Sequence, residues 1–128
     1  GGYGALKLGL SKPESFAAAA SLSGSCDLLN LRQRPEELAL VFGDAAGIRK
    51  SGGDLAELAR TAASSRGPKP KLFQSCGTED AMLPGNRDFR DAIAPLGFDY
   101  VYEESPGAHD WAYWDQGIQR ILNWLPLP

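Results

Sequence analysis

The chain contains 128 residues, and its 16 acidic residues outnumber its 13 basic ones, giving a formal net charge of −3 at pH 7. Hydrophobic residues make up 43% of the sequence and charged residues 23%, a balance that indicates a globular domain and excludes a disordered chain. No basic stretch offers a surface for nucleic acid, and no apolar stretch reaches the roughly 18 residues of a membrane-spanning helix. We therefore expect neither a nucleic-acid partner nor a membrane one.

The N-terminal part of the sequence predicts a helix, a strand and a helical excursion. Over 3–10 the apolar residues recur on one helical face, and Pro13 should end that helix. The alanine-rich segment 16–24 favours a helix by propensity, but its short span between Pro13 and Gly24 favours a buried strand. Residues 28–66 show helical patterns interrupted by glycines, and we interpret them as an excursion from the main sheet.

Two further strands follow, with a helix between them. Residues 71–76 lie between a proline-rich lead-in and a glycine, which predicts a strand. The alternating segment 98–104 predicts another strand. Between the two strands we expect a helix over 86–97, with Asn86 as its N-cap and Gly97 as its C-cap.

The last segment, 111–125, predicts a long helix that Asp110 caps and Pro126 ends. Six apolar residues keep the helical period: Trp111, Trp114, Ile118, Ile121, Leu122 and Leu125. Strands thus alternate with helices along the chain. This order predicts an α/β fold, with a mostly parallel sheet flanked by helices on both faces.

The two cysteines, Cys26 and Cys76, have no metal-ligand spacing, so we expect two small buried side chains and no metal site. Nothing in the sequence indicates a disulfide scaffold. A reducing compartment is therefore favoured, and we predict a cytoplasmic location.

Chemistry in this class of fold lies at the carboxyl ends of the strands, which here hold the segments SLSGSCD, SCGTED and ESPGAHD. The third segment contains His109, the only histidine, a side chain suited to proton transfer near neutral pH. The second contains Asp80, which could orient the imidazole if the two strands are neighbours. The order Asp before His is that of an α/β-hydrolase triad. The alternatives are a loop histidine without function and a carboxylate that only starts a turn.

A nucleophile is not apparent, because the G-x-S-x-G elbow is absent from the sequence. Ser23 and Ser25 follow the first predicted strand but lack the flanking glycines of a sharp turn. Ser75 and Cys76 end the second strand, where such a pair is more typical of packing. All four are weak candidates.

Three segments together resemble the esterase D-like branch of the α/β-hydrolases, which includes S-formylglutathione hydrolases, tributyrin esterases and feruloyl or acetyl-xylan esterases. The opening GGYGALKLGL…FAAAASLSG resembles the stretch after the nucleophile, CGTED the end of the acid strand, and PGAHDWAYW the histidine loop. The segment WLPL near the C-terminus looks most like tributyrin-type esterases. The resemblance covers nearly the whole chain.

This resemblance implies a serine carboxylesterase that hydrolyses short-chain acyl esters without a cofactor. Asp80 would be the triad acid and His109 the base that takes the serine proton. Trp111, two residues after the histidine, would contact a small-molecule ester substrate.

The family's elbow ends in two glycines followed by a tyrosine, which Gly1 and Gly2 match, so the serine would stand two residues before Gly1. The glycines, including Gly4, would allow the tight elbow and close packing of the helix on the sheet. We interpret 1–128 as the C-terminal portion of a single α/β-hydrolase domain, with 28–66 as its lid. The chain would carry the acid and the base without the nucleophile serine, and we expect it to be inactive alone.

Two alternatives stay open. The chain could be a truncated or split, catalytically inactive module, whose partner is the missing N-terminal half or a second copy in a homo-oligomer. It could also be a thiol enzyme that uses Cys76, which requires an activated thiolate.

Overall fold

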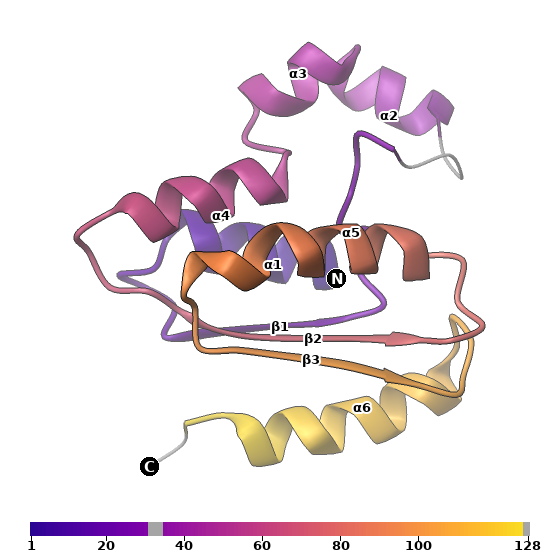
Figure 1. Cartoon of the computed structure of the whole chain (residues 1–128). Coiled ribbons are helices and arrows are strands. Elements are labelled where there is room, and N and C mark those ends of the chain that lie inside the picture. Colours follow the sequence, from indigo (N-terminus) through magenta and orange to yellow (C-terminus); the bar gives the residue numbers. More distant parts are fainter. Residues whose placement is uncertain (31–34, 127–128) are drawn as a thin grey trace.

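The computed structural model describes residues 1–30 and 35–126. Helices and strands alternate along these residues, and the segments predicted as strands and helices are confirmed in type (Figure 1). The elements are α1 (Gly2–Ser11), β1 (Ala18–Leu22), α2 (Pro35–Phe42), α3 (Ala45–Lys50), α4 (Leu55–Ser64), β2 (Lys71–Gly77), α5 (Leu83–Ile93), a 3-10 turn η1 (Ala94–Leu96), β3 (Tyr100–Ser105) and α6 (Trp111–Trp124).

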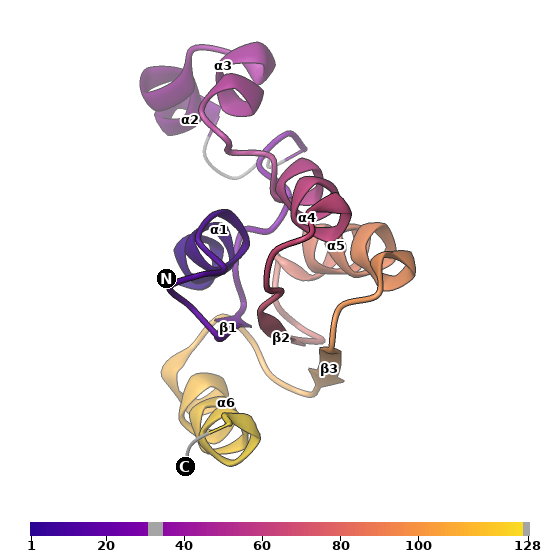
Figure 2. The same ribbon diagram turned by 90° about the vertical axis from the view of Figure 1, so that its left-hand side faces the viewer.

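The three strands form one parallel sheet in the order β1-β2-β3. Phe73 in β2 pairs with Ala20 in β1 and with Val101 in β3. Helices α1, α4 and α5 cover one face of the sheet and α6 covers the other (Figure 2). The predicted α/β class with helices on both faces is therefore confirmed.

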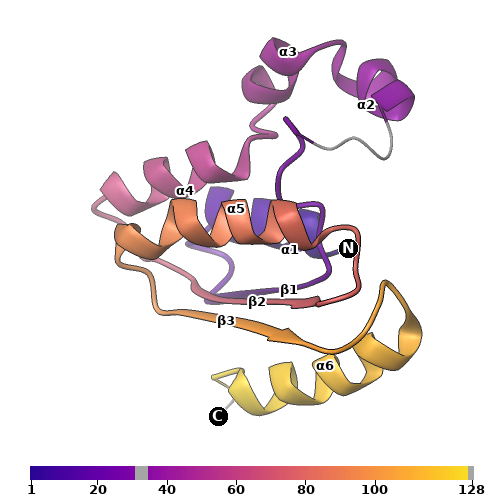
Figure 3. The ribbon, with the colours of Figure 1, turned by 45° about the vertical axis from the view of Figure 1, so that its right-hand side comes forward.

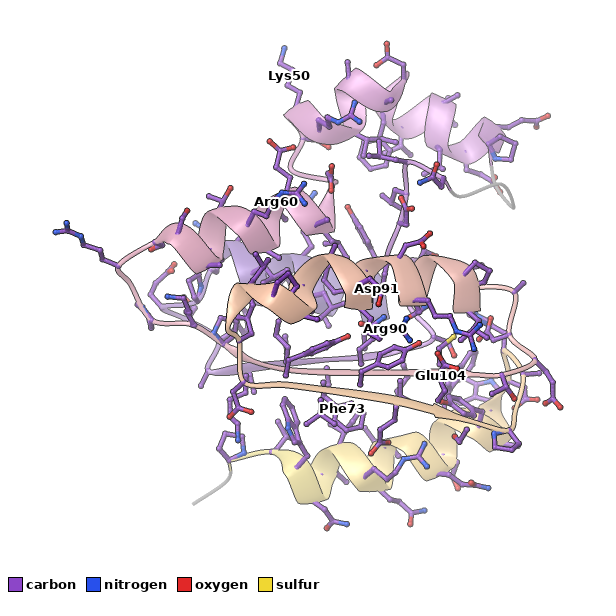
Figure 4. All side chains as sticks on the ribbon, viewed as in Figure 1. Lys50, Arg60, Phe73, Arg90, Asp91 and Glu104 are labelled. Atoms are coloured by element: carbon purple, nitrogen blue, oxygen red, sulfur yellow. The ribbon has the colours of Figure 1, made fainter. Side chains whose placement is uncertain are left out.

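The central strand β2 is buried on both faces, because helices cover both sides of the sheet at this strand. Leu72 is completely buried among side chains of α1, α4 and α5. Phe73 lies on the opposite face, towards α6, and its ring centroid is 5.4 Å from that of Trp124 (Figure 4). Burial on both faces explains why this strand does not alternate between apolar and polar residues, and why even Gln74 is completely buried.

Helix α1 lies close to β1 because two of its residues have no side chain. A Cβ atom at Gly9 would lie 2.5 Å from the Ala19 Cβ atom, and one at Gly2 would lie 2.4 Å from the Ser21 hydroxyl oxygen. The expected close packing is confirmed for Gly2. It is wrong for Gly1 and Gly4, where a Cβ atom would meet nothing within 4 Å.

Helix α5 begins one turn earlier than predicted. It runs from Leu83, with Pro84 in its first turn, where a proline costs no hydrogen bond. Asn86 is therefore a fully buried residue inside the helix and not its N-cap. Gly97 has a φ of +77° and ends the 3-10 turn that follows, as expected for a left-handed C-cap.

The apolar residues of α6 are only partly buried. Ile121 is buried, whereas Trp111, Ile118 and Leu122 are exposed. The helix instead approaches the sheet through Gly117, where a Cβ atom would lie 2.7 Å from a Leu22 methyl carbon. A three-stranded sheet is too narrow to cover the whole apolar side of this helix.

The excursion 28–66 is helical, as its pattern predicted, and its described residues form the three helices α2, α3 and α4. Asp44 caps α3 and Asp54 caps α4, which packs against α1 and α5. Helices α2 and α3 stand beyond the other helices, on the side of the sheet away from α6 (Figure 3). Helix α2 has no buried residue.

Candidate active site

An acid and a histidine meet at the carboxyl end of the sheet. Asp80 comes three residues after the end of β2, and His109 comes four residues after the end of β3. Because β2 and β3 are parallel neighbours, both turns emerge at the same edge. The His109 Nδ1 atom lies 2.9 Å from Asp80 Oδ2 and 3.2 Å from Asp80 Oδ1. The predicted proximity of these two residues is therefore present.

The Asp80 carboxylate is held in one orientation by its own turn. Its side chain is completely buried, and Oδ1 accepts a 2.8 Å hydrogen bond from the Met82 backbone N–H. The backbone carbonyl of Asp80 accepts from the Leu83 N–H at 3.0 Å, which joins the turn to the start of α5. One carboxylate thus bonds both a backbone amide and the imidazole ring.

The histidine loop is attached to the end of β2 by close backbone contact. The Gly107 carbonyl accepts from the Glu79 N–H at 3.0 Å, and a Cβ atom at Gly77 would lie 2.1 Å from that carbonyl oxygen. Gly107 itself has a φ of +149°, which disfavours other residues. Only glycine at position 77 lets the two loops approach this closely.

Helix α6 follows the histidine at once and is fixed at its start. The Asp110 side chain caps it by accepting from the Tyr113 N–H at 3.0 Å, as the sequence predicted. The buried hydroxyls of Tyr113 and Ser75 also hydrogen-bond to each other, which ties the helix to β2. The sequence pattern gave no signal for this anchor.

A cavity of about 640 Å³ opens beside the imidazole. It lies between the start of α1, the end of β1 and the exposed side of α6 and is lined by His109, Gly1, Gly2, Tyr3, Ala20, Leu22, Ser23, Gly24, Ser25, Met82, Trp111, Trp114, Ile118 and Ile121. The Trp114 ring packs edge-on against His109, with centroids 4.9 Å apart, and Trp111 packs edge-on against Trp114. Trp111 is 82% exposed, so it lies at the rim of the cavity and does not anchor α6 in the core.

No described residue of the excursion 28–66 lines the cavity beside His109. Helices α2 and α3 lie on the other side of the sheet from α6. The described residues of the excursion therefore show no contact with the cavity, and the role of 28–66 as a lid stays a prediction.

The four weak nucleophile candidates are not bonded to the histidine. Ser75 is buried against Tyr113, and the Ser25 hydroxyl contacts the Met82 sulfur at 3.5 Å. Ser23 and Ser25 line the cavity, but no hydroxyl or thiol of residues 1–30 and 35–126 is found hydrogen-bonded to His109. Burial raises the pKa of Cys76 to about 12, which disfavours the thiolate that a thiol enzyme needs.

Both cysteines are buried and free. Across the part of the chain that the structure describes, no cluster of three or more His, Cys, Asp or Glu residues could hold a metal ion. None of the helices in that part is long and apolar enough to cross a membrane.

A parallel sheet between helices, with an acid and a histidine after consecutive strands at its carboxyl edge, is the arrangement of an α/β-hydrolase. Residues 1–125 match the family model described as "Putative esterase". The chain belongs to this esterase family of the α/β-hydrolase superfamily, and the predicted resemblance is confirmed at that level.

Similar proteins agree with this assignment. An acetyl esterase from Caldicellulosiruptor saccharolyticus is 30% identical over 135 residues, covering 98% of this chain and 51% of the relative. The solved structure of the fluorophosphonate-binding serine hydrolase FphF of Staphylococcus aureus, substrate bound, is 32% identical with a TM-score of 0.81, over 96% of this chain and 49% of that one. The S-formylglutathione hydrolase FrmB of Staphylococcus aureus, as apoenzyme, is also 32% identical, with a TM-score of 0.79 over 96% and 50% of the two chains.

A ferulic acid esterase that is 20% identical has a TM-score of 0.74 over 97% of this chain and 47% of that one, and it supports the fold alone. The chain spans about half the length of the relatives it matches.

Proposed function

We propose that this chain supplies the acid and the base of a serine carboxylesterase that hydrolyses short-chain acyl esters. The observation that carries the proposal is the hydrogen bond between buried Asp80 and His109 at the mouth of the cavity. In the triad, Asp80 accepts from the Nδ1–H group of His109 and so presents Nε2 as a base. No cofactor is required for this reaction.

The proposed reaction has two steps, acylation and deacylation, and in each step Nε2 accepts a proton and then releases it. The serine hydroxyl gives its proton to His109 as its oxygen attacks the ester carbonyl carbon. His109 then returns the proton to the departing alcohol, which leaves an acyl-serine. Water, deprotonated by the same nitrogen, attacks the acyl carbonyl carbon, and the bond to the serine oxygen breaks as His109 returns the proton to that oxygen, which releases the acid and restores the serine hydroxyl. Asp80 stabilises the imidazolium during both steps.

The serine implied by the resemblance would precede Gly1. Two observations support this position. Gly1 and Gly2 line the same cavity as His109, and α1 begins there. The N-terminal end of a helix carries a partial positive charge, which would stabilise the oxyanion that forms on the attacked carbonyl.

We further propose that Trp111 contacts the small-molecule ester substrate. Trp111 lies at the rim of the cavity, and its exposed ring is free to contact an acyl or alcohol group. Short acyl groups are supported by the similarity to an acetyl esterase and to an S-formylglutathione hydrolase.

The experiment compares this chain with a longer protein that includes the segment preceding Gly1. Each is treated with a fluorophosphonate probe, which labels an activated serine, and assayed with p-nitrophenyl acetate. We expect one adduct and a His109-dependent rate from the longer protein. We expect no adduct from the 128-residue chain and no rate above its His109→Ala variant. An adduct on the 128-residue chain would show that one of its own serines is the nucleophile.

A second candidate function, an association module, is supported by one surface. β1 is an edge strand, and next to it α6 exposes Trp111, Ile118 and Leu122 on one side. A free parallel edge beside exposed apolar side chains favours pairing with another chain. The partner would be an N-terminal half or a second copy. Co-expression with a chain that supplies the preceding strands separates the two functions, because restored hydrolysis indicates a split enzyme and an inert complex indicates a module.

A further inference from the structure

The side chain of Asn86 holds two backbone carbonyls beneath the cavity. Asn86 is fully buried on α5, and its amide nitrogen donates to the Gly24 carbonyl and to the Met82 carbonyl, each at 2.8 Å. Gly24 lies in the loop after β1, and Met82 lies in the turn after β2. One side chain therefore joins two of the loops at the carboxyl edge of the sheet.

Both residues held by Asn86 belong to the candidate site. Gly24 and Met82 line the cavity beside His109. Met82 also donates its backbone N–H to Asp80 Oδ1 at 2.8 Å. The bonds run without a break from His109 through Asp80 and Met82 to Asn86.

The remaining groups of Asn86 are fixed by the sheet. Its Oδ1 atom accepts from the Gln74 side-chain amide at 2.7 Å, and that amide also donates to the Asn86 backbone carbonyl at 2.9 Å. The other end of Gln74 accepts from the Tyr100 hydroxyl. Gln74 is also completely buried, so both amides are oriented by partners on β2, β3 and α5. A buried network with all partners present is rigid, and losing one member leaves its neighbours unpaired at a cost in free energy.

We infer that Asn86 is a positioning residue for the Asp80–His109 pair, acting by fixing Met82 and, through the Met82 amide, the Asp80 carboxylate. The inference rests on the proposed function, because positioning matters only if His109 must present Nε2. An apolar residue could fill the space of Asn86 and would keep the 3.1 Å bond from its backbone N–H to the Met82 carbonyl, but it could not bond the Gly24 carbonyl and so could not hold that carbonyl at one distance from Met82.

The test uses the single histidine of the 128-residue chain, whose two ring nitrogens give unambiguous 15N NMR signals. These signals report which nitrogen carries the proton in the neutral ring. Asn86→Asp keeps the side-chain volume but removes both donors, and Asn86→Ala removes the side chain. We expect the His109 signals of both variants to move from the wild-type positions towards those of Asp80→Asn, in which the Nδ1–H group loses its carboxylate partner.

Phe89→Leu is the matched control, because Phe89 is a buried residue one turn further along α5 whose side chain has no group that could donate to either carbonyl. Urea denaturation measures the loss of stability in each variant. We expect Phe89→Leu to lower stability and leave the His109 signals unchanged. Unchanged signals in folded Asn86→Asp, with a clear shift in Asp80→Asn, would overturn the positioning role and leave the proposed function intact.

Unchanged signals in Asp80→Asn would count against the proposed function itself. If both Asn86 variants fail to fold, Gln74→Glu replaces them. It removes the amide that orients Asn86 and keeps an acceptor for Tyr100, and its His109 signals are judged in the same way.

Discussion

The carboxylate of Asp80 is completely buried, whereas the imidazole of His109, 2.9 Å away, is half exposed towards the cavity. Because water cannot reach the Asp80 carboxylate, its hydrogen bonds to the Met82 backbone N–H and to His109 determine its orientation. The exposed partner keeps one ring nitrogen accessible. This asymmetry suits a pair in which the acid orients and the histidine exchanges protons.

Removing the charge of Asp80 should abolish most of the activity. In the longer protein, Asp80→Asn is expected to lower kcat by about 10³–10⁴-fold, because the amide no longer favours the Nδ1–H tautomer or stabilises the imidazolium. The measurement is the steady-state rate on p-nitrophenyl acetate. Glu79→Gln, which alters an exposed neighbouring carboxylate, should leave the rate unchanged. Equal losses in the two variants would count against the triad.

A methyl group at position 77 should displace the histidine loop. Gly77→Ala places a Cβ atom 2.1 Å from the Gly107 carbonyl oxygen, and the backbone must move to relieve the clash. We expect a loss of about 1–3 kcal/mol in the free energy of unfolding, measured with urea, and a shift of the His109 NMR signals. Gly4→Ala is the control. Its Cβ atom meets nothing within 4 Å, so the free energy of unfolding should be unchanged or higher by up to about 1 kcal/mol. A stable Gly77→Ala protein with unmoved His109 signals would contradict the close contact.

Both thiols should be unreactive in the folded chain. Burial raises the pKa of Cys26 and of Cys76 to about 12, so the neutral thiol predominates at pH 7. Iodoacetamide at pH 7 should add nothing within the time that alkylates both cysteines in urea, as followed by intact mass. Rapid single labelling of the folded chain would revive the thiol-enzyme alternative.

The ion pair between α5 and β3 should make part of the stability depend on acid pH. The bidentate Arg87 guanidinium and the Tyr102 hydroxyl hold the pKa of Glu104 at about 2, below its usual 4.5. Arg90 lies beside the same carboxylate (Figure 4). A carboxylate with a lowered pKa stabilises the fold above pH 4.5 and loses that contribution as the pH falls towards 2.

Glu104→Gln should therefore cost about 1 kcal/mol at pH 7, a figure reduced for the partial exposure of the pair. Urea denaturation at several pH values measures the difference from wild type. The difference in the free energy of unfolding between wild type and Glu104→Gln should decrease as the pH falls from 4.5 to 2. A gap that stays constant over this range would show that the carboxylate charge contributes nothing.

Trp111 offers a test of substrate contact that is separate from folding. Because the side chain is 82% exposed, Trp111→Ala should change the stability of the 128-residue chain by less than about 0.5 kcal/mol. In the longer protein the same change should raise KM for ester substrates more than it lowers kcat. An unchanged KM would remove Trp111 from the substrate site.

Local patterns in the sequence predicted most of the architecture. Strand and helix types follow from periodicity, and the caps at Asp110 and Gly97 follow from the chemistry of those residues. The end of the helical segment formed by α5 and η1 could be located in this way, at Gly97, although α5 itself ends at Ile93. Its beginning could not, because Pro84 and the pairing of Asn86 with Gln74, rather than a capping side chain at Asn86, define the first turn.

The sequence by itself determined that an acid and the only histidine follow successive strands of an α/β chain. Only the tertiary structure decided that these strands are neighbours, which brings the two side chains within 2.9 Å. It also decided that Asn86 lies beneath the site, that Trp111 faces the cavity, and that α2 and α3 stand away from it. Periodicity and turn chemistry act between residues a few positions apart, whereas these contacts join distant segments and depend on how the layers pack.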